Sequence, residues 1–464
     1  MTYPPFALTR LTLSMGVLLL AGCNGNDSSP KPEQPTLGHR TVSLIEQDGL
    51  QFKDLDGSGA LTPYEDWRLG AAERARDLVG RLSLAQKAGL MMHGTLVLNA
   101  DGRVNLTAMD KMLREDGVNT FITRMAGDPA AIADDNNRLQ ALLEGVGLGI
   151  PMTVSTDPRN HFTHDPNATS IGAGAFSQWP ETLGLAAIGD AALVQRFGDI
   201  ARQEYRAVGI HEALSPQADL ATEPRWGRIN GTFGEDNLLA KSLVKAYIEG
   251  FQQGSDGIGK ESVVTVVKHF AGAGPQKDGL DAHNPWGKEQ VYPGGQFAYH
   301  LVPFEGAFEA KVGAVMPYYA LPEGLTYEGQ AIEEVGFGFN RQILTDLLRG
   351  HFKFDGVVLS DWGIVNDCNA RCEQGLTQDE VTAGVSPWTV PFGMSWGVEK
   401  LTKAERYAKA IDAGVDQFGG VEDPAPLLAA VQSGLVTEAA ITTSAERILE
   451  QKFALGLFEN PYVH

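Results

Sequence analysis

Ionisable and aromatic side chains that could carry out chemistry follow several short apolar runs of this sequence. The set comprises Arg124, Asp157, Lys268, His269, Tyr319, Asp361 and Trp362. A carboxylate can act as a nucleophile, a lysine can form a Schiff base with a carbonyl compound, and basic side chains can hold a polar ligand. A single aspartate at a strand end more often caps the following helix. The number of such residues at equivalent positions therefore predicts a functional site.

The elements that would position these side chains are eight apolar runs that alternate with segments of helical spacing. The predicted strands are residues 89–96, 119–125, 151–157, 213–220, 264–270, 314–319, 356–362 and 415–420. The predicted helices include residues 137–145, 190–208, 238–252 and 340–352. This alternation is typical of an α/β fold, the (β/α)₈ TIM-like barrel, in which the carboxyl ends of the strands meet at one mouth. An open doubly wound sheet is the alternative, but its glycine-rich dinucleotide fingerprint is missing.

A second candidate site is the acidic loop at residues 54–65. Oxygen-bearing side chains fall at loop positions 1, 3, 5, 9 and 12, and Gly59 at position 6 allows a sharp turn. The predicted calcium ligands are Asp54, Asp56, Ser58, Ala60, Thr62 and Glu65. An acidic turn that binds no metal is the alternative. Because no second loop of this kind is available to pair with it, this EF-hand-like segment predicts a structural Ca²⁺ rather than a calcium sensor.

The composition is that of a folded enzyme with an acidic surface. Of the 464 residues, 43% are hydrophobic, and 58 acidic against 37 basic residues leave a formal charge of −21. Such a surface repels phosphate backbones, and no basic run interrupts it, so nucleic acid is excluded as a partner. Cys368 and Cys372 could form a disulfide in an exported protein, and without a neighbouring histidine they are a weak zinc signal.

The N-terminus has the pattern of an export signal. Arg10 precedes an apolar stretch at 11–21, which is shorter than the about 20 residues of a membrane-spanning helix. The Leu-Ala-Gly-Cys sequence ending at Cys23 resembles a bacterial lipoprotein signal. This resemblance implies lipidation of Cys23 and a periplasmic or cell-envelope location with an outer-membrane anchor, whereas a plain secretory signal is the alternative. The predicted organisation is a signal peptide (1–22), a flexible tether (23–45), the EF-hand-like segment (46–70) and the barrel (71–464).

Longer motifs in the chain carry a family resemblance. They are Ser215-Pro-Gln-Ala-Asp219, Glu223-Pro-Arg225-Trp226-Gly227-Arg228, Thr232-Phe-Gly234-Glu235-Asp236, Val267-Lys268-His269-Phe270-Ala271-Gly272, Gly356-Val-Val-Leu-Ser360-Asp361-Trp362-Gly363 and the tail from Arg447 to Tyr462. In this order they resemble glycoside hydrolase family 3, from about Phe52 to the end of the chain. The resemblance implies a catalytic barrel that acts on β-linked sugars, as exo-acting β-glucosidases and their relatives do. No cofactor is expected for catalysis.

The resemblance also implies roles for individual residues. Asp361 matches the nucleophile, which attacks the anomeric carbon and later leaves as a glycosyl ester. The positions that bind hydroxyl groups of the same sugar are matched by Asp157, Arg228, Lys268 and His269. We expect the cations among these four to keep Asp361 ionised. Trp362 and Tyr319 are expected to form a wall against the sugar, and Arg124 to lie in the pocket or in a barrel salt bridge.

A retaining hydrolase also needs an acid/base group about 5–5.5 Å from its nucleophile, and here the sequence departs from the family pattern. Two-domain members supply this group from a second α/β domain after the barrel, and single-domain members from an Asp-x-His pair after the fifth strand. This chain has Asp281-Ala-His283 on the equivalent loop, but reads Ala271-Gly-Ala-Gly274 where those members carry Pro-Gly-His-Gly. His283 is one candidate, and a second domain or partner subunit that completes the active site is the other.

Three hypotheses follow for the function. The leading one is an exported, lipid-anchored, exo-acting retaining β-glycosidase that hydrolyses β-glucosides or related oligosaccharides through a covalent glycosyl-aspartate. In the second, Lys268 is the Schiff-base lysine of an aldolase-type barrel, which borohydride trapping with a carbonyl substrate would reveal. In the third, the barrel binds sugar without efficient turnover because the acid/base residue is missing.

Overall fold

The computed structural model describes residues 32–162, 171–172, 174–385 and 392–464. Of these, the residues from Pro35 to His464 belong to one structural unit. The predicted signal peptide and the predicted lipidation site, Cys23, lie outside the described residues. Among the helices that are described, none is long and apolar enough to cross a membrane.

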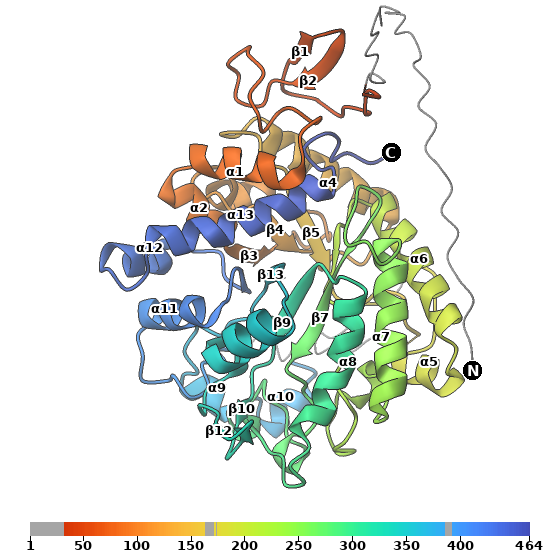
Figure 1. Ribbon diagram of the computed structural model, residues 1–464, viewed down its shortest axis with the longest axis vertical. Helices are drawn as coiled ribbons and strands as arrows, with labels where there is room; N and C mark the ends of the chain where they lie inside the picture. Colours follow the sequence, from red (N-terminus) through yellow and green to blue (C-terminus); the bar gives the residue numbers. More distant parts are fainter. Residues whose placement is uncertain (1–31, 163–170, 173, 386–391) are drawn as a thin grey trace, which may run out of the picture. The chain divides into compact units, whose positions relative to one another are not determined.

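Eight parallel strands form the central sheet, in chain order around a barrel (Figure 1). They are β3 (Met92–Thr95), β4 (Thr120–Ile122), β5 (Thr153–Thr156), β6 (Glu212–Ala213), β7 (Val264–Phe270), β9 (Ala314–Pro317), β13 (Val357–Val358) and β14 (Phe418–Gly419). The two ends of the sheet meet where Leu359 bridges Gln417, and the Ser360 N–H donates to the Gln417 carbonyl at 2.8 Å. The predicted (β/α)₈ barrel is therefore confirmed, and each predicted strand contains or adjoins an observed one.

The largest difference from the predicted strands is at β6, which ends at Ala213 although its apolar run continues to residue 220. Pro216 has no N–H to donate to a sheet ladder, so regular pairing stops before it. The chain nevertheless stays beside β7, because the Lys268 N–H donates to the Pro216 carbonyl at 3.0 Å and the Ala218 N–H donates to the Lys268 carbonyl at 2.7 Å. This irregular stretch brings Asp219 to the end of β7.

Helices surround the barrel, and in Figure 1 α6, α7 and α8 lie side by side on one flank. The main helices are α1 (Ala71–Arg81), α2 (Leu84–Leu90), α3 (Leu106–Arg114), α4 (Pro129–Glu144), α5 (Thr182–Ile188), α6 (Ala191–Ala207), α7 (Asn237–Gln252), α8 (Phe297–Glu309), the π-helix η5 (Gln342–His351), α11 (Lys403–Ala413), α12 (Ala425–Gln432) and α13 (Glu438–Ala454). Helix α4 begins eight residues before the predicted 137–145, because Asp128 caps it and Pro129 fits its first turn.

Short elements complete the fold. A hairpin of β1 (Leu44–Gln47) and β2 (Leu50–Lys53) precedes α1. The loops after the barrel strands carry short strands and helices, which are β8 (Glu289–Gln290), β10 (Leu321–Pro322), β11 (Thr326–Tyr327), β12 (Gln330–Ala331), α9 (Ala370–Gln374) and α10 (Gln378–Thr382). They also carry the short 3₁₀ turns η1 (Ile229–Gly231), η2 (Lys277–Gly279), η3 (Pro285–Gly287) and η4 (Phe337–Phe339). Cys368 and Cys372, the second of which lies on α9, form a disulfide.

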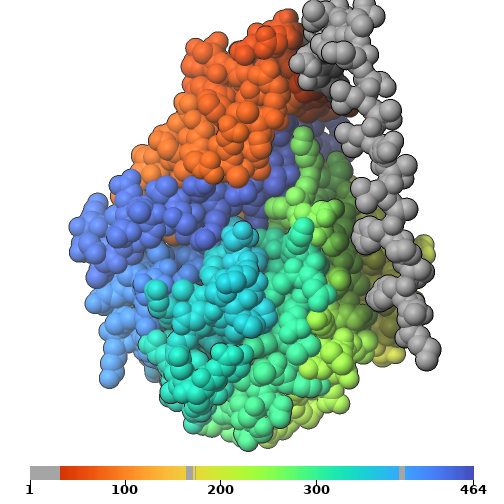
Figure 2. Space-filling view, viewed as in Figure 1, coloured from red at the N-terminus to blue at the C-terminus, as the bar shows by residue number. Residues whose placement is uncertain are grey.

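The segment before the barrel packs against the C-terminal helices, the orange and dark blue regions that adjoin in Figure 2. Arg74 on α1 pairs with Glu459 at 2.6 Å, and its guanidinium lies over the Phe453 ring at 4.4 Å. The Arg40 N–H donates to the Glu144 carboxylate at 2.8 Å. Residues from about Gly38 onward are therefore held against the barrel, so the end of the predicted tether (23–45) is part of the folded unit.

A buried lysine, Lys452, lies inside the barrel at the N-terminal ends of β4 and β5. Lys452 on α13 donates to the carbonyls of Asn119 and Pro151, each at 3.0 Å, and to the Thr153 hydroxyl at 2.8 Å. Burial lowers the pKa of Lys452 to about 7 and raises the pKa of Glu212 to about 7, and the attraction between the two groups opposes both shifts. These three hydrogen bonds tie the last helix to the N-terminal ends of β4 and β5.

Replacing Lys452 by methionine is therefore expected to lower the free energy of unfolding by about 3–5 kcal/mol, because it leaves Glu212 without its cation and three buried acceptors without a donor. Urea unfolding followed by circular dichroism measures this change. Lys409→Met is the control, since Lys409 pairs with Glu333 near the surface, and its loss should cost about 1 kcal/mol or less. Equal effects of the two substitutions would contradict the role of the buried Lys452 ammonium.

Candidate active site

Asp157 connects two of the predicted site cations at the carboxyl end of β5. Arg124, which follows β4, donates to one Asp157 oxygen at 2.5 Å, and the Lys268 ammonium lies 3.7 Å from the other. Burial lowers the pKa of Lys268, and the negative charge of Asp157 offsets part of this shift. Arg124 is about one third exposed and forms a salt bridge with Asp157, which is one of its two predicted environments.

Asp219 holds the Nδ1 side of the His269 ring. The Asp219 carboxylate accepts from His269 Nδ1 at 2.7 Å and from the backbone N–H groups of His269 and Ala273 at 2.9 and 2.8 Å. With its proton on Nδ1, the ring presents Nε2 to Arg228 at 3.4 Å. Burial lowers the pKa of His269, although Asp219 acts against this shift. The lowered pKa favours the uncharged ring at neutral pH.

Asp361 lies at the carboxyl end of β13, with its side chain buried. One oxygen accepts the Trp362 backbone N–H at 2.8 Å, and the other lies 3.8 Å from His269 Nε2. The Tyr319 hydroxyl donates to the Trp362 carbonyl at 2.7 Å, and burial followed by the charge of Asp361 raises the pKa of Tyr319 well above 10. Tyr319 is therefore a neutral hydrogen-bond donor beside the carboxylate.

The Asp281–His283 pair lies on the loop after β7, as predicted. Asp281 accepts from His283 Nδ1 at 2.5 Å, from the His283 backbone N–H at 2.9 Å and from Trp226 Nε1 at 2.8 Å. Burial alone would raise the pKa of Asp281, but His283 and then Arg228 outweigh it and hold the pKa below its usual range. The His283 ring packs edge-on against Tyr319, with 4.9 Å between ring centres, which brings the pair to the same wall as Trp362.

Three buried polar atoms among these residues have no hydrogen-bond partner in the described part of the chain: Arg228 Nε, Asp361 Oδ2 and Trp362 Nε1. Buried polar groups in native proteins are nearly always satisfied, so each such atom calls for a partner. Two are donors and one is an acceptor, which matches the hydroxyl groups of a polyol that donate and accept at once. The arrangement can therefore bind a sugar beside an acidic side chain.

The family model described as "Glycosyl hydrolase family 3 N terminal domain" matches residues 103–451. The chain belongs to glycosyl hydrolase family 3. A periplasmic beta-glucosidase/beta-xylosidase from Dickeya chrysanthemi is 55% identical over 438 residues, which are 93% of this chain and 66% of that protein. Beta-glucosidase C from Emericella nidulans is 43% identical over 411 residues, 87% of this chain and 62% of that protein. The chain thus spans slightly less than two thirds of these curated relatives.

A solved structure supports the fold of this family 3 barrel. The beta-glucosidase from Listeria innocua in complex with isofagomine superposes with a TM-score of 0.62 at 23% identity, over 84% of this chain and 47% of that one.

The acidic loop lies at the other end of the family 3 barrel, after β2. Ligand atoms of Asp54, Asp56 and Glu65 all lie within 4.8 Å of one another. Backbone N–H groups orient them: Gly59 donates to Asp54 at 3.2 Å, and the Leu55 N–H donates to Glu65 at 2.7 Å. A strand precedes the loop and a turn follows it, so the predicted loop lacks the two flanking helices of an EF-hand.

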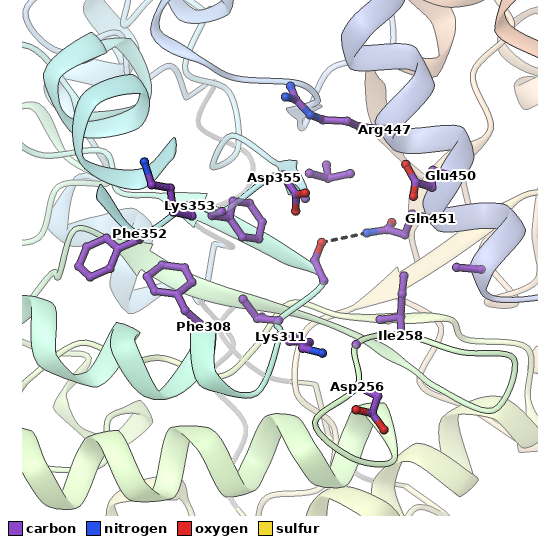
Figure 3. Close-up of a pocket in the computed structure, with 17 residues that line it drawn as sticks. Asp256, Ile258, Phe308, Lys311, Phe352, Lys353, Asp355, Arg447, Glu450 and Gln451 are labelled. Carbon is purple, nitrogen blue, oxygen red and sulfur yellow. Dashed lines mark hydrogen bonds between the residues drawn. The ribbon is translucent and has the colours of Figure 1, made fainter. Parts of the chain in front are cut away.

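A cavity of about 480 Å³ lies at the N-terminal ends of β9 and β13, away from the strand carboxyl ends (Figure 3). Phe308 and Phe352 lie on one side of it, and Arg447, Glu450 and Gln451 project from α13 on the other. Gln451 donates to the Gly313 carbonyl at 3.4 Å, the dashed line in Figure 3. None of the predicted site residues lines this cavity, so its size does not identify it as the active site.

Several residues of the site were not among the predicted ones. Asp219 orients His269, Trp226 holds Asp281, and Trp396 Nε1 donates to the Ala282 carbonyl at 2.7 Å. Tyr318 packs against the His269 ring with 5.1 Å between ring centres. Asp219 and Trp226 do fall within the motifs of the sequence, and Asp219 lies one residue before the end of the predicted strand 213–220, which is the available signal. Their partners lie about fifty residues away, which local spacing does not reveal.

Proposed function

We propose that this chain is the catalytic barrel of an exo-acting retaining β-glycosidase, which hydrolyses O-glycosidic bonds of β-glucosides or related β-linked oligosaccharides. The observation that carries the proposal is the set of unpartnered buried atoms on Arg228, Asp361 and Trp362. A glycosyl unit with its anomeric carbon beside Asp361 supplies hydroxyl partners for such atoms. The relatives named beta-glucosidase or beta-glucosidase/beta-xylosidase support the substrate class.

In this proposal Asp361 is the nucleophile. Its Oδ2 has no hydrogen-bond partner among the described residues, so no protein donor has to be displaced before this oxygen attacks the anomeric carbon. Oδ1 is fixed by the Trp362 N–H, which holds the carboxylate in one orientation. The attack forms the Asp361–glycosyl ester and breaks the bond to the leaving group. Water later cleaves the ester, and the product keeps the β configuration because the carbon is inverted twice.

Asp157, Arg228, Lys268 and His269 bind the hydroxyl groups of the same sugar. Asp157 is a charge-assisted acceptor held between Arg124 and Lys268, and neutral His269 is fixed in one tautomer by Asp219. Because these groups are positioned before substrate binds, hydrogen bonds that strengthen in the transition state need no rearrangement of the protein. Tyr319 and Trp362 form the wall on the nucleophile side.

His283 is the proposed acid/base. Its Nδ1 proton is committed to Asp281, so Nε2 is the nitrogen available to protonate a leaving group and later to accept a proton from water. Asp281 orients this tautomer, as a carboxylate does in other acid/base pairs built on histidine. A second domain or a partner subunit is the competing source of the acid/base. Comparing substrates whose leaving groups do and do not need a proton, in a His283 variant, separates the two alternatives.

The Schiff-base alternative for Lys268 makes a different prediction. Incubation with a carbonyl substrate and borohydride would add a stable mass to an aldolase-type lysine. With Lys268 pairing with Asp157 as a sugar-binding cation, no such adduct is expected, whereas its appearance would remove the glycosidase proposal.

We further propose that the loop at 54–65 binds one structural Ca²⁺. The grouping of three carboxylates within 4.8 Å supports this, because each carboxylate oxygen keeps a lone pair beyond its bond to a backbone N–H. Saturating calcium, about 100 times its dissociation constant, is expected to stabilise the fold by about 2.7 kcal/mol. Thermal unfolding with EGTA, with Ca²⁺ and with Mg²⁺ measures this effect.

Asp54→Asn should abolish the calcium-dependent shift in Tm, and Asp423→Asn, an exposed aspartate elsewhere, should preserve it. Because the loop and Asp361 lie at opposite ends of the barrel, kcat at a temperature where the protein stays folded should not depend on calcium. Identical melting curves with EGTA and with calcium would contradict the proposed metal site.

Export to the periplasm with lipidation at Cys23 completes the proposal. The Leu-Ala-Gly-Cys sequence and the relatives named periplasmic support it. Cys23→Ser should release the protein from the membrane fraction into the soluble periplasmic fraction. Retention of the Cys23→Ser protein in the outer membrane would contradict lipidation as the anchor.

A further inference from the structure

A second pocket on the catalytic side of the barrel contains none of the residues assigned to the active site. It has a volume of about 430 Å³ and lies between the loop after β6, the loop after β7 and the first turn of α8. The side chains that give it its chemistry are Glu223, Gln276, Tyr292, Gln296, Tyr299 and His300. Its size falls in the range of small-molecule sites.

The lining is suited to an uncharged ligand with many hydroxyl groups. Among the described residues that line the pocket, none is a lysine or arginine, and the carboxylate of Glu223 already pairs with Arg225 at 2.9 Å. Amides, phenol groups and an imidazole both donate and accept hydrogen bonds, and the rings of Tyr292 and Tyr299 offer faces for C–H groups. A phosphate or carboxylate would find no cation here.

Several of these groups are held in place by the surrounding protein. Gln276 donates to Gln290 at 2.8 Å, and Gln290 in turn donates to the Tyr292 hydroxyl at 2.6 Å. The Tyr299 hydroxyl donates to the Glu235 carbonyl at 3.0 Å and accepts the Asn237 N–H at 3.2 Å. A pocket whose walls are fixed in advance loses little conformational entropy when a ligand binds.

His300 supplies an independent sign of a missing ligand. Its side chain is 4% exposed, and its Nδ1 atom has no hydrogen-bond partner in the described part of the chain. Burial lowers the pKa of His300 to about 4, so the ring is neutral at physiological pH. A neutral ring nitrogen without a partner fits a hydroxyl group, from a ligand or from a water that the ligand orders.

We propose that this pocket is an accessory binding site for one neutral glycosyl unit, separate from the site around Asp361. The spread of carboxylate, amide, phenol and imidazole groups around the pocket matches a ring with hydroxyls on all sides better than an alcohol with one. The two sites share a wall, because Tyr318 donates to Gln276 at 3.4 Å and packs against His269. The inference goes beyond the proposed glycosidase activity and does not require it.

The test is a titration of the full chain labelled with fluorotyrosine, followed by ¹⁹F NMR, with glucose, xylose and glucuronate as probes. The Tyr292 resonance is identified by its loss in Tyr292→Phe. A saturable shift of this resonance with glucose or xylose is expected, and it should persist in Asp361→Gly, since the pocket does not include Asp361. This readout reports the pocket itself, so its failure is distinguishable from a failure of the proposed catalysis.

Gln296→Ala should weaken the binding at least tenfold, because the exposed Gln296 amide lines the pocket and makes no capping bond of its own. His300→Gln is a second variant for the same titration, chosen because glutamine keeps a polar group at this buried position. Gln378→Ala, an exposed amide on α10, is the matched control and should change nothing. Three outcomes would each overturn the proposal. They are no shift of the Tyr292 resonance up to the solubility limit of the sugars, an unaltered titration in Gln296→Ala, and tighter binding of glucuronate than of glucose or xylose.

Discussion

Replacing Asp361 by glycine is expected to lower kcat for an aryl β-glucoside by about 10⁴-fold or more, because the substitution removes the group that forms the covalent intermediate. Binding should suffer much less, since Lys268 keeps its contact with Asp157 and His269 keeps its hydrogen bond to Asp219. Steady-state kinetics with a nitrophenyl glucoside measure the loss. Asp256→Gly, at an exposed aspartate in the loop between α7 and β7, is the control and should retain wild-type kcat.

The same variant has a diagnostic product. Azide can occupy the space of the missing carboxylate and attack from its face, so that a single inversion gives the α-glycosyl azide. Recovery of activity with azide and detection of the α anomer by ¹H NMR are therefore expected for Asp361→Gly. A β-glycosyl azide, or a variant with nearly full activity, would mean that another group is the nucleophile.

Replacing His283 by alanine is expected to reduce kcat by about 10²–10⁴-fold for an alkyl β-glucoside, whose leaving group must be protonated. A dinitrophenyl glucoside should be cleaved to the glycosyl-enzyme at nearly the wild-type rate, because dinitrophenolate departs without a proton. Pre-steady-state kinetics with the two substrates measure the difference. His351→Ala, at an exposed histidine at the end of η5, is the matched control.

Azide again separates the possible outcomes for His283. With Asp361 intact, azide attacks the glycosyl-enzyme from the opposite face, and two inversions give the β-glycosyl azide. Azide should therefore accelerate His283→Ala, and the β anomer should accumulate. Equal kinetics of the variant and the wild type for both leaving groups would place the acid/base outside this loop, on a second domain or partner subunit.

The barrel could be predicted from sequence because its signal is repetitive. Eight apolar runs alternate with helical segments, and each run keeps its place in the sheet order. Boundaries were predicted less well where a single residue overrides the pattern. Pro216 ends β6 early, and Asp128 with Pro129 starts α4 early. Both effects depend on one backbone N–H group, which a hydrophobicity pattern does not register.

The residues proposed to contact the sugar could be named from the sequence because they follow predicted strands, as Asp157 does, or lie in contiguous motifs, as Lys268 and Asp361 do. Those that orient them could not, because their contacts join distant segments. Asp219 reaches His269 across fifty residues, and Trp226 reaches Asp281 across fifty-five. The protonation of His269 depends likewise on how deeply the ring is buried, which the sequence does not show. Burial and tertiary contact, rather than residue type, decide these properties.

The most direct test of the account is the intact mass of the wild-type protein after incubation with a 2-fluoro-β-glucoside that carries a dinitrophenolate leaving group. The fluorine slows hydrolysis of the glycosyl ester, and the leaving group requires no acid, so the experiment isolates the nucleophile. The account predicts a mass gain of one fluoroglucosyl unit, located on Asp361 by peptide mapping and absent in Asp361→Gly. A stable adduct on any other residue, or no adduct with either the glucose or the xylose reagent on calcium-saturated folded protein, would contradict it.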